Sequence, residues 1–182
     1  MNLPSSFLRH APVTSPKPWE HCWRDGDKTP VLRNRILAAR ETTDVILLDF
    51  TDCLGQLAAD DSLMTTLAYA FRNAAARLLE LDPRELGVLT VPTGPAGTTR
   101  GVVLYDNVSG GAGHVRELME QGPDLIRIAH HVLFVDEEHH QRCETGCLDC
   151  LLSFDAQRVV ANRPFIRRQA HQCLHRLVEQ VH

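Results

Sequence analysis

The sequence predicts an α/β domain in which a small sheet is flanked by helices and a cysteine zinc knuckle lies near the C-terminus. Three observations predict this fold: short apolar runs suited to buried strands, apolar residues at helical spacing, and three cysteines within eight residues. The chain of 182 residues has the usual length of one domain and can bury a core of its own.

Three segments have the character of strands. Residues 43–50 (TDVILLDF) form an apolar run that suits a buried strand. Residues 85–91 and 100–105 follow, separated by the flexible stretch PTGPAGTT, which favours a hairpin-like connection. A small sheet is therefore expected from these segments.

The longest predicted helix covers residues 60–81, where apolar side chains recur every three or four positions. Asp60 or Asp61 supplies its N-cap, and Asp82-Pro83 stops it. We therefore expect one apolar stripe of this helix to cover the sheet.

Three further helices follow toward the C-terminus. The first covers residues 113–121 and ends at Gly122, and Pro123 then opens the second at its first helical position. The last covers residues 163–181, with Asn162 as its N-cap.

Residues 1–40 contain five prolines and few signals of order, so they are predicted to form an extended N-terminal arm, with residues 41–182 as the domain. The N-terminus has no apolar stretch typical of a secretory signal, and no run is long enough for a membrane helix. We therefore expect a cytoplasmic protein without membrane contact, in which thiols stay reduced.

The net charge of −4 excludes a molecule that is polycationic as a whole. The last predicted helix nevertheless has a basic side, formed by Arg163, Arg167 and Arg168 together with His171 and Arg176. These arginines are candidates for contact with DNA phosphates, and the alternative is a solvated helix face.

The strongest chemical signal is the segment HHQRCETGCLDC, which ends in Cys143, Cys147 and Cys150. Zinc takes four nitrogen or sulfur ligands in a tetrahedron, and thiolates two or three residues apart wrap it without strain. Gly146 allows the tight turn that such a knuckle requires. The sequence therefore predicts one structural Zn²⁺ site.

The fourth ligand is left open by the sequence. His140 is favoured because it gives the spacing His-x2-Cys-x3-Cys-x2-Cys. The alternatives are His139 and Cys173 equally, followed by Cys22, Cys53 or another group. The cysteines also have two interpretations without zinc, as free buried thiols or as a redox pair formed by Cys147 and Cys150.

A glycine-rich turn follows the third predicted strand. Gly110, Gly111 and Gly113 lie between Asp106 and the next helix, so free amides at that helix start could bind phosphate. The turn matches neither the Walker A pattern nor a dinucleotide fingerprint. The alternative is that the glycines serve packing. Acid–base hydrolysis by Asp106 and His114 would require that the two side chains meet in space.

Four segments carry a family resemblance, in this order: TTDVILLDF, the helix around residues 70–81, LYDNVSGGAGHV and CETGCLDCLLSF. Through them the chain resembles the C-terminal zinc-binding domain of MrfA-type DNA helicases. The same domain occurs in the DrmB component of the DISARM anti-phage system, and the resemblance covers residues 36–171. It implies a four-cysteine zinc cluster, in which a cysteine often stands where this chain has Gln141. That departure is why a histidine enters the predicted ligand set.

The resemblance also implies a superfamily-2 DNA helicase on the same chain or on a partner, since this chain has no Walker A motif. We therefore expect a non-catalytic zinc-binding subunit or module of a helicase complex, in DNA repair or anti-phage defence. It would aid DNA binding or assembly, with DNA reached through the complex. The alternatives are a protein-interaction subunit without DNA contact and a metal-dependent nuclease.

Overall fold

The structure is a computed structural model that describes residues 42–180. The predicted arm, residues 1–40, lies outside the described residues, so the domain boundary at residue 41 stays a prediction. The helices and strands are β1 (Val45–Asp49), α1 (Thr51–Leu54), α2 (Asp61–Leu78), β2 (Leu86–Thr93), β3 (Thr99–Asp106), α3 (His114–Glu120), α4 (Gly122–Leu133), α5 (Glu137–Arg142), α6 (Gln157–Val160) and α7 (Arg167–Gln180).

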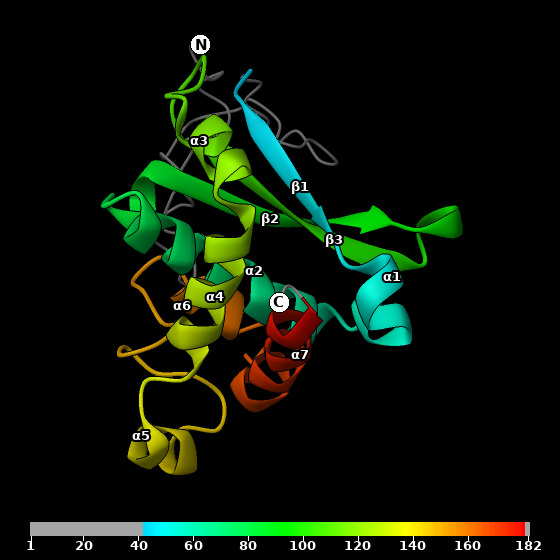
Figure 1. Ribbon diagram of the computed structural model, residues 1–182, viewed down its shortest axis with the longest axis vertical. Helices are drawn as coiled ribbons and strands as arrows, with labels where there is room; N and C mark the ends of the chain where they lie inside the picture. The colour runs from blue at the N-terminus through cyan, green and yellow to red at the C-terminus, as the bar shows by residue number, and fades with distance from the viewer. Residues whose placement is uncertain (1–41, 181–182) are drawn as a thin grey trace, which may run out of the picture. The chain divides into compact units, whose positions relative to one another are not determined.

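The three predicted strands form one antiparallel sheet in the order β1-β3-β2 (Figure 1). Leu47 pairs with Val103, and Leu89 pairs with Val103 from the other side. β2 and β3 are joined by the predicted hairpin, whose connection contains a short 3-10 turn over Pro95–Gly97. The predicted fold class is confirmed, and β1 and β2 are the two edges of the sheet.

Helix α2 lies at the centre of the domain and is buried on most of its faces, whereas the sequence predicted that only one apolar face would be buried against the sheet. Asp60 caps it, as predicted, by accepting hydrogen bonds from the amides of Ser62 and Leu63 at 2.8 and 3.0 Å. Nearly every residue from Leu63 to Ala76 is buried. The many alanines of α2 allow the sheet, α4 and α7 to approach it from several sides.

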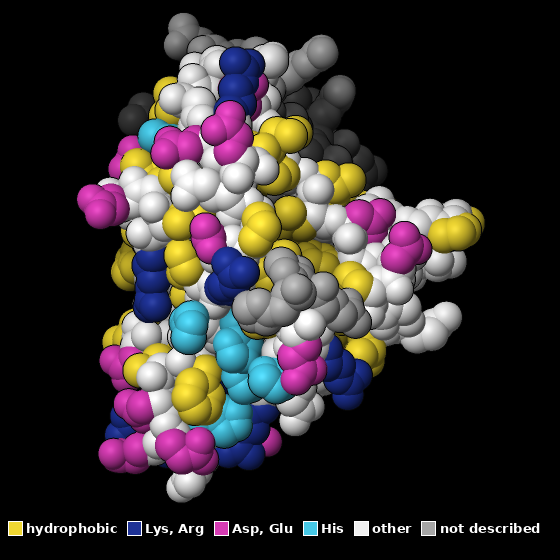
Figure 2. Space-filling model, in the orientation of Figure 1, with side chains coloured by type: hydrophobic (Ala, Val, Ile, Leu, Met, Phe, Trp, Pro, Cys, Tyr) yellow, Lys and Arg dark blue, Asp and Glu magenta, His cyan; other side chains and the backbone are white. Residues whose placement is uncertain are grey.

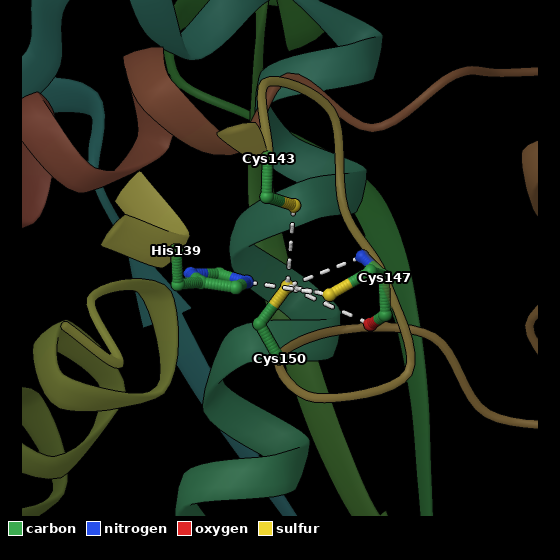
Figure 3. A group of neighbouring side chains, drawn as sticks. All are labelled: His139, Cys143, Cys147 and Cys150. Carbon is green, nitrogen blue, oxygen red and sulfur yellow. Dashed lines mark hydrogen bonds between the residues drawn. The ribbon is translucent and has the colours of Figure 1, made fainter. Parts of the chain in front are cut away.

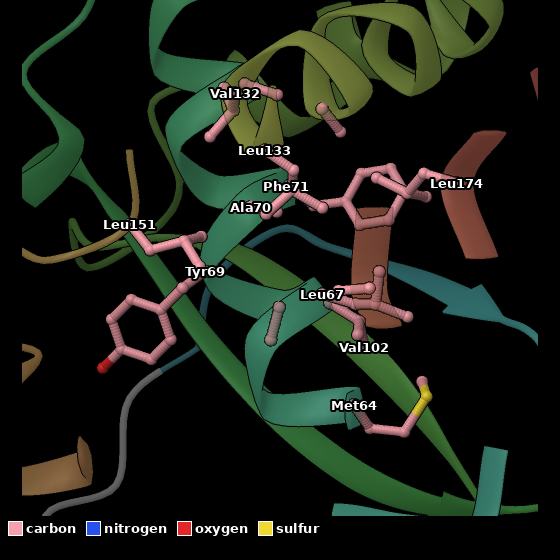
Figure 4. Close-up of a cluster of buried hydrophobic side chains, with 14 of the residues drawn as sticks. Met64, Leu67, Tyr69, Ala70, Phe71, Val102, Val132, Leu133, Leu151 and Leu174 are labelled. Atoms are coloured by element: carbon pink, nitrogen blue, oxygen red, sulfur yellow. The ribbon is translucent and has the colours of Figure 1, made fainter. Parts of the chain in front are cut away.

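The core therefore lies on both sides of α2. Figure 4 shows Phe71 and Leu67 of α2 beside Leu174 of α7, with Val102 of β3 nearby. Phe50 stacks on Phe71 with ring centroids 5.5 Å apart. Because α4 and α7 also pack against each other, the C-terminal half is fixed to the sheet through α2.

Two helix ends differ from the prediction. Helix α2 ends at Leu78, before Asp82-Pro83, and Glu80 takes a left-handed conformation with φ of 55°. Helix α7 begins at Arg167, four residues after the predicted start. The preceding segment is held by tertiary contacts, since the amide of Ile166 donates to Thr66 Oγ1 at 3.0 Å.

The short helices α1, α5 and α6 were not predicted, because four to six residues give no periodicity to recognise. None of the described helices has the length and apolar character needed to span a bilayer.

Candidate metal centre

Helix α5 and the residue that ends it carry two of the candidate ligands, His139 within the helix and Cys143 at its C-cap. Asp136 caps its start by accepting a hydrogen bond from the amide of His139 at 2.6 Å. His139 and Cys143 are four residues apart, so their side chains lie on one face of this turn. Both are buried, with 1% and 8% of their surface exposed. Helix α5 therefore places one imidazole beside one thiol.

The knuckle turn supplies the other two ligands. The amides of Cys150, Leu151 and Leu152 all donate to the carbonyl of Cys147, at 2.9–3.2 Å, and the amide of Cys147 donates to Cys150 Sγ at 3.2 Å. Gly146, just before the turn, has φ of 158°, which residues with a side chain rarely adopt. Leu151 is fully buried and anchors the turn to the core.

His139, Cys143, Cys147 and Cys150 converge, as Figure 3 shows. Their ligand atoms all lie within 4.8 Å of one another. Cys150 Sγ is 3.9 Å from Cys147 Sγ and 4.0 Å from Cys143 Sγ, and His139 Nε2 is 3.3 Å from Cys147 Sγ. We call these four residues the Cys3His group.

The Cys3His group fits a tetrahedral zinc ion. Zn–S bonds of about 2.3 Å separate two sulfurs by about 3.8 Å, and a Zn–N bond of about 2.0 Å gives an N···S separation of about 3.5 Å. The three separations given above differ from these values by only a few tenths of an ångström, and the other pairs of ligand atoms lie within 4.8 Å. The group is therefore consistent with Zn²⁺ binding, and the predicted cofactor is supported by the geometry.

Burial sets the protonation of these groups when no metal is bound. It raises the pKa of Cys143 and raises that of Cys150 to about 12, so both thiols hold their protons at neutral pH. Burial likewise lowers the pKa of His139, which keeps a lone pair available on the neutral ring. Zinc ligation must therefore release protons from the thiols.

Arg167 supports the Cys3His group from the start of α7. Its guanidinium is fully buried and donates to the carbonyls of Cys143 at 2.7 Å, His140 at 3.1 Å and Leu133. A zinc ion with three thiolates carries a net negative charge, which the buried guanidinium offsets. Sequence reasoning missed this structural role, because an arginine on the polar side of an amphipathic helix gives no signal of burial.

The predicted phosphate contacts of the last helix are mostly engaged within the domain. Arg167 is inaccessible to DNA, which corrects its assignment as a phosphate contact. Arg168 donates to the carbonyls of Gln141 at 2.6 Å and His140 at 3.3 Å. Arg163 forms an ion pair with Asp61 at 3.2 Å. The structure therefore leaves no continuous free basic face formed by these three arginines.

His140, the favoured fourth ligand, lies outside the Cys3His group. Its ring contacts Phe134 and His171, with centroids 5.3 and 5.2 Å apart. His140 thus belongs to a group of histidines from α4, α5 and α7 whose rings contact one another, and Figure 2 shows histidine side chains gathered on this face. Two adjacent histidines can each reach a cysteine three or four residues on, so the spacing alone could not choose between them.

The remaining alternatives for the fourth ligand are also apart from the group. Cys173 is buried in the core on α7, and Cys53 lies beside the carbonyl of Phe50 at 3.4 Å. Cys22 is outside the described residues. Among the candidates that the structure describes, His139 alone completes the set of four.

The glycine turn does not offer free amides to a phosphate. The buried carboxylate of Asp106 accepts hydrogen bonds from the amides of Ala112, Gly113 and Val115 at 2.7, 2.7 and 3.2 Å. The amide of Gly110 donates to the carbonyl of Thr42, and that of Gly111 donates to Val108.

The amides of the predicted anion site are thus used within the chain, which corrects the expected phosphate contact at Gly110, Gly111 and Gly113 and favours packing. The same contacts leave Asp106 unsuited to acid–base work with His114. That histidine instead lies 3.9 Å from Glu85.

Residues 67–151 match the family described as MZB, the MrfA Zn-binding domain. The predicted family resemblance is confirmed over this segment. The MZB match contains all of the Cys3His group, together with most of α2 and the strands β2 and β3. Arg167 lies beyond its end.

Two solved structures of the DUF1998 helicase MrfA are similar to the chain, one bound to DNA and AMPPNP and the other to DNA. Their TM-scores are 0.48 and 0.47 at 15% and 17% identity, over 72% and 70% of this chain. The matched part spans only 15% of the length of each helicase chain. No curated protein sequence matches the chain.

Proposed function

We propose that this chain is a non-catalytic zinc-binding module of a DNA helicase complex. The observation that carries the proposal is the coincidence of the MZB match with the Cys3His group inside it. We assign His139, Cys143, Cys147 and Cys150 as the ligands of one Zn²⁺. Four protein ligands close the tetrahedron and leave no position for a catalytic water, so the zinc is structural.

The partner we propose is a superfamily-2 DNA helicase, in the cytoplasm, acting in DNA repair or anti-phage defence. The helicase would be on a separate subunit or on the same polypeptide, and it would supply the ATPase activity. Assembly is favoured over direct DNA contact by this domain, because Arg163, Arg167 and Arg168 are engaged with its own acceptors. DNA would then be reached through the helicase.

The metal assignment is tested by elemental analysis of protein purified without added metal. Wild type should carry one zinc per chain, and His139→Ala should lose most of it because a ligand is removed. His140→Ala is the matched control, with the same residue type one position further along α5, and it should retain zinc. Retention in His139→Ala with loss in His140→Ala would reverse the assignment, and absence of zinc from wild type would remove the proposal.

The role in assembly is tested by adding an MrfA-type helicase to the zinc-loaded chain. We expect the chain and the helicase to co-elute in size-exclusion chromatography. The chain alone should not bind fluorescent single- or double-stranded DNA. Direct DNA binding that falls steeply with salt would favour phosphate contact instead. Failure to co-elute, with no effect on the DNA affinity of the helicase, would argue against the proposed partner.

A further inference from the structure

Three histidines from two packed helices lie close together, and none of them belongs to the Cys3His group. His130 of α4 lies against His171 and His175 of α7, with ring centroids 4.5 and 5.5 Å apart. The centroids of His171 and His175 are 6.2 Å apart. We call these three residues the histidine cluster, and Figure 2 shows histidine side chains gathered on one face of the molecule.

The spacing on α7 places potential ligands along one side of the helix. His171 and His175 are four residues apart, and two histidines at this spacing on one helix face are a recurrent zinc-binding arrangement. Glu179 follows after four more residues, and its Oε1 lies 3.7 Å from His175 Nε2. Helix α4 packs against α7 and supplies His130 from the other side. The two helices thus bring three imidazoles and one carboxylate together.

Two of these rings have a buried nitrogen without a partner. The Nε2 atoms of His130 and His171 are shielded from solvent, and neither makes a hydrogen bond within the described part of the chain. Buried polar atoms are normally paired, so each of these nitrogens requires an explanation. Burial lowers the pKa of both rings, which are therefore neutral at pH 7 and keep a lone pair. Both can act as metal ligands without first losing a proton.

The separations within the histidine cluster suit a single transition-metal ion. Zn–N bonds of about 2.0 Å place the centroids of imidazoles in a tetrahedron roughly 5 Å apart. The observed centroid separations of 4.5–6.2 Å lie around this value. Two ligand atoms of one zinc are about 3.3 Å apart, which is close to the 3.7 Å between His175 Nε2 and Glu179 Oε1.

The histidine cluster is not yet arranged around a common centre. Its ring planes lie within 21–28° of one another, so the rings must turn for their nitrogens to converge. The torsion that turns an imidazole is broad, so this is a side-chain adjustment. Among the described residues, only the Cys3His group has its ligand atoms already converged. His175 is 58% exposed, which gives an ion a path into the cluster from solvent.

The two neighbouring histidines are less suited to bind the same ion. His140 Nδ1 lies 3.5 Å from Arg167 Nη1, so a guanidinium already occupies that side of its ring. His131 is exposed and meets His130 edge-on, with centroids 5.8 Å apart. The candidate ligands are therefore the histidine cluster and Glu179.

We infer that the histidine cluster binds a second divalent transition-metal ion, with His130, His171 and His175 as nitrogen ligands and Glu179 as an oxygen ligand. Imidazole suits zinc, copper and nickel. The ion gives the two buried nitrogens a partner and joins α4 to α7. Because its ligands must first turn toward it, this ion is held more weakly than the zinc of the Cys3His group and is exchangeable. The inference does not depend on the assignment of the Cys3His group.

The first experiment is calorimetric titration of Ni²⁺ into the full chain purified with its zinc. His171→Gln and His175→Gln should each weaken Ni²⁺ binding at least about tenfold, since even the hydrogen-bond partners of metal ligands contribute about 10–100-fold to affinity. His131→Gln is the matched control, an exposed histidine next to His130, and it should bind as wild type does. Zinc content is measured after each titration and should stay unchanged.

Two measurements on wild type keep the inference testable if the variants do not fold. Paramagnetic Ni²⁺ should broaden the ring-proton NMR signals of the histidine cluster and spare that of His114, which lies beside Glu85 on α3. Ni²⁺ should also raise the melting temperature of wild type, because it binds the folded chain in which α4 and α7 are packed together.

Three results would overturn the inference. The first is Ni²⁺ binding that is absent, or that His171→Gln and His175→Gln leave unchanged. The second is release of one zinc for each Ni²⁺ bound, which would place the ion in the Cys3His group. The third is broadening confined to histidines outside the histidine cluster, which would show adventitious surface binding. None of these results changes the zinc content of untreated wild type, so they are distinguishable from failure of the proposed function.

Discussion

Replacing Arg167 by methionine should strongly destabilise the C-terminal half of the domain. The guanidinium donates to carbonyls on three segments, at Leu133 at the end of α4, His140 in α5 and Cys143 in the Cys3His group. Methionine fills much of the same space but donates nothing, so three buried acceptors lose their partner at once.

The size of the effect follows from two opposing terms. Each hydrogen bond to a charged group contributes about 1.5–3 kcal/mol, which gives a gross loss of about 4.5–9 kcal/mol for three acceptors. Removing a buried charge recovers several kcal/mol of desolvation. We expect a net loss of about 3 kcal/mol in the free energy of unfolding, or about 10 °C in melting temperature for a domain of this size.

The assay is urea denaturation of zinc-loaded protein, followed by circular dichroism. Arg176→Met is the matched control on the exposed side of α7, and it should change the free energy of unfolding by less than about 0.5 kcal/mol. If Arg167→Met unfolded like wild type but bound DNA more weakly, the structural role would be refuted and the phosphate role predicted from the sequence would be restored.

Three other perturbations test separate parts of the structure. Asp106→Asn leaves one side-chain acceptor for the three amides of the glycine turn, so the free energy of unfolding measured by urea denaturation should fall by about 2–4 kcal/mol. A decrease below about 0.5 kcal/mol would contradict the role of the Asp106 carboxylate in holding those amides. Chelating the zinc should lower the melting temperature and speed hydrogen exchange around α5 while β3 stays protected, and an unchanged melting temperature after proven zinc loss would show that the metal is not structural. Burial, with the charges of neighbouring histidines, lowers the pKa of His171 to about 4, so between pH 6.5 and 4 the unfolded chain takes up a proton that the folded chain does not. The free energy of unfolding of wild type should therefore fall as the pH drops through that range, and that of His171→Phe should fall less. Equal decreases in wild type and His171→Phe between pH 7.5 and 5 would contradict this prediction.

Periodicity and capping chemistry predicted much of the fold. Asp60 acts as the predicted N-cap of α2, and the strands and hairpin form where apolar runs and turn residues placed them. The start of α7 could not be predicted, because Asn162 and Pro164 carry the local signals of a helix start while contacts with α2 keep residues 163–166 out of the helix. Tertiary contacts override local propensity there.

Part of the metal site could likewise be predicted from the sequence, and part depends on tertiary contacts. The spacing of Cys143, Cys147 and Cys150 is enough to predict that the thiols converge, because short loops permit few geometries. The choice between His139 and His140 depends on how α5 is rotated, and that rotation is fixed by Asp136 and by packing against α7. Spacing likewise cannot reveal that Asp106 already uses the amides of the glycine turn.

The Cys3His group also has a consequence for the order in which the domain forms. All four residues lie within residues 139–150, so bringing them together closes only very short loops and has a small entropic cost. Residues 139–150 can therefore bind the metal before the sheet forms, while the segment still has few contacts with the rest of the domain. The long-range connection is made by Arg167, which joins this segment to α7 and can form only when that helix has docked.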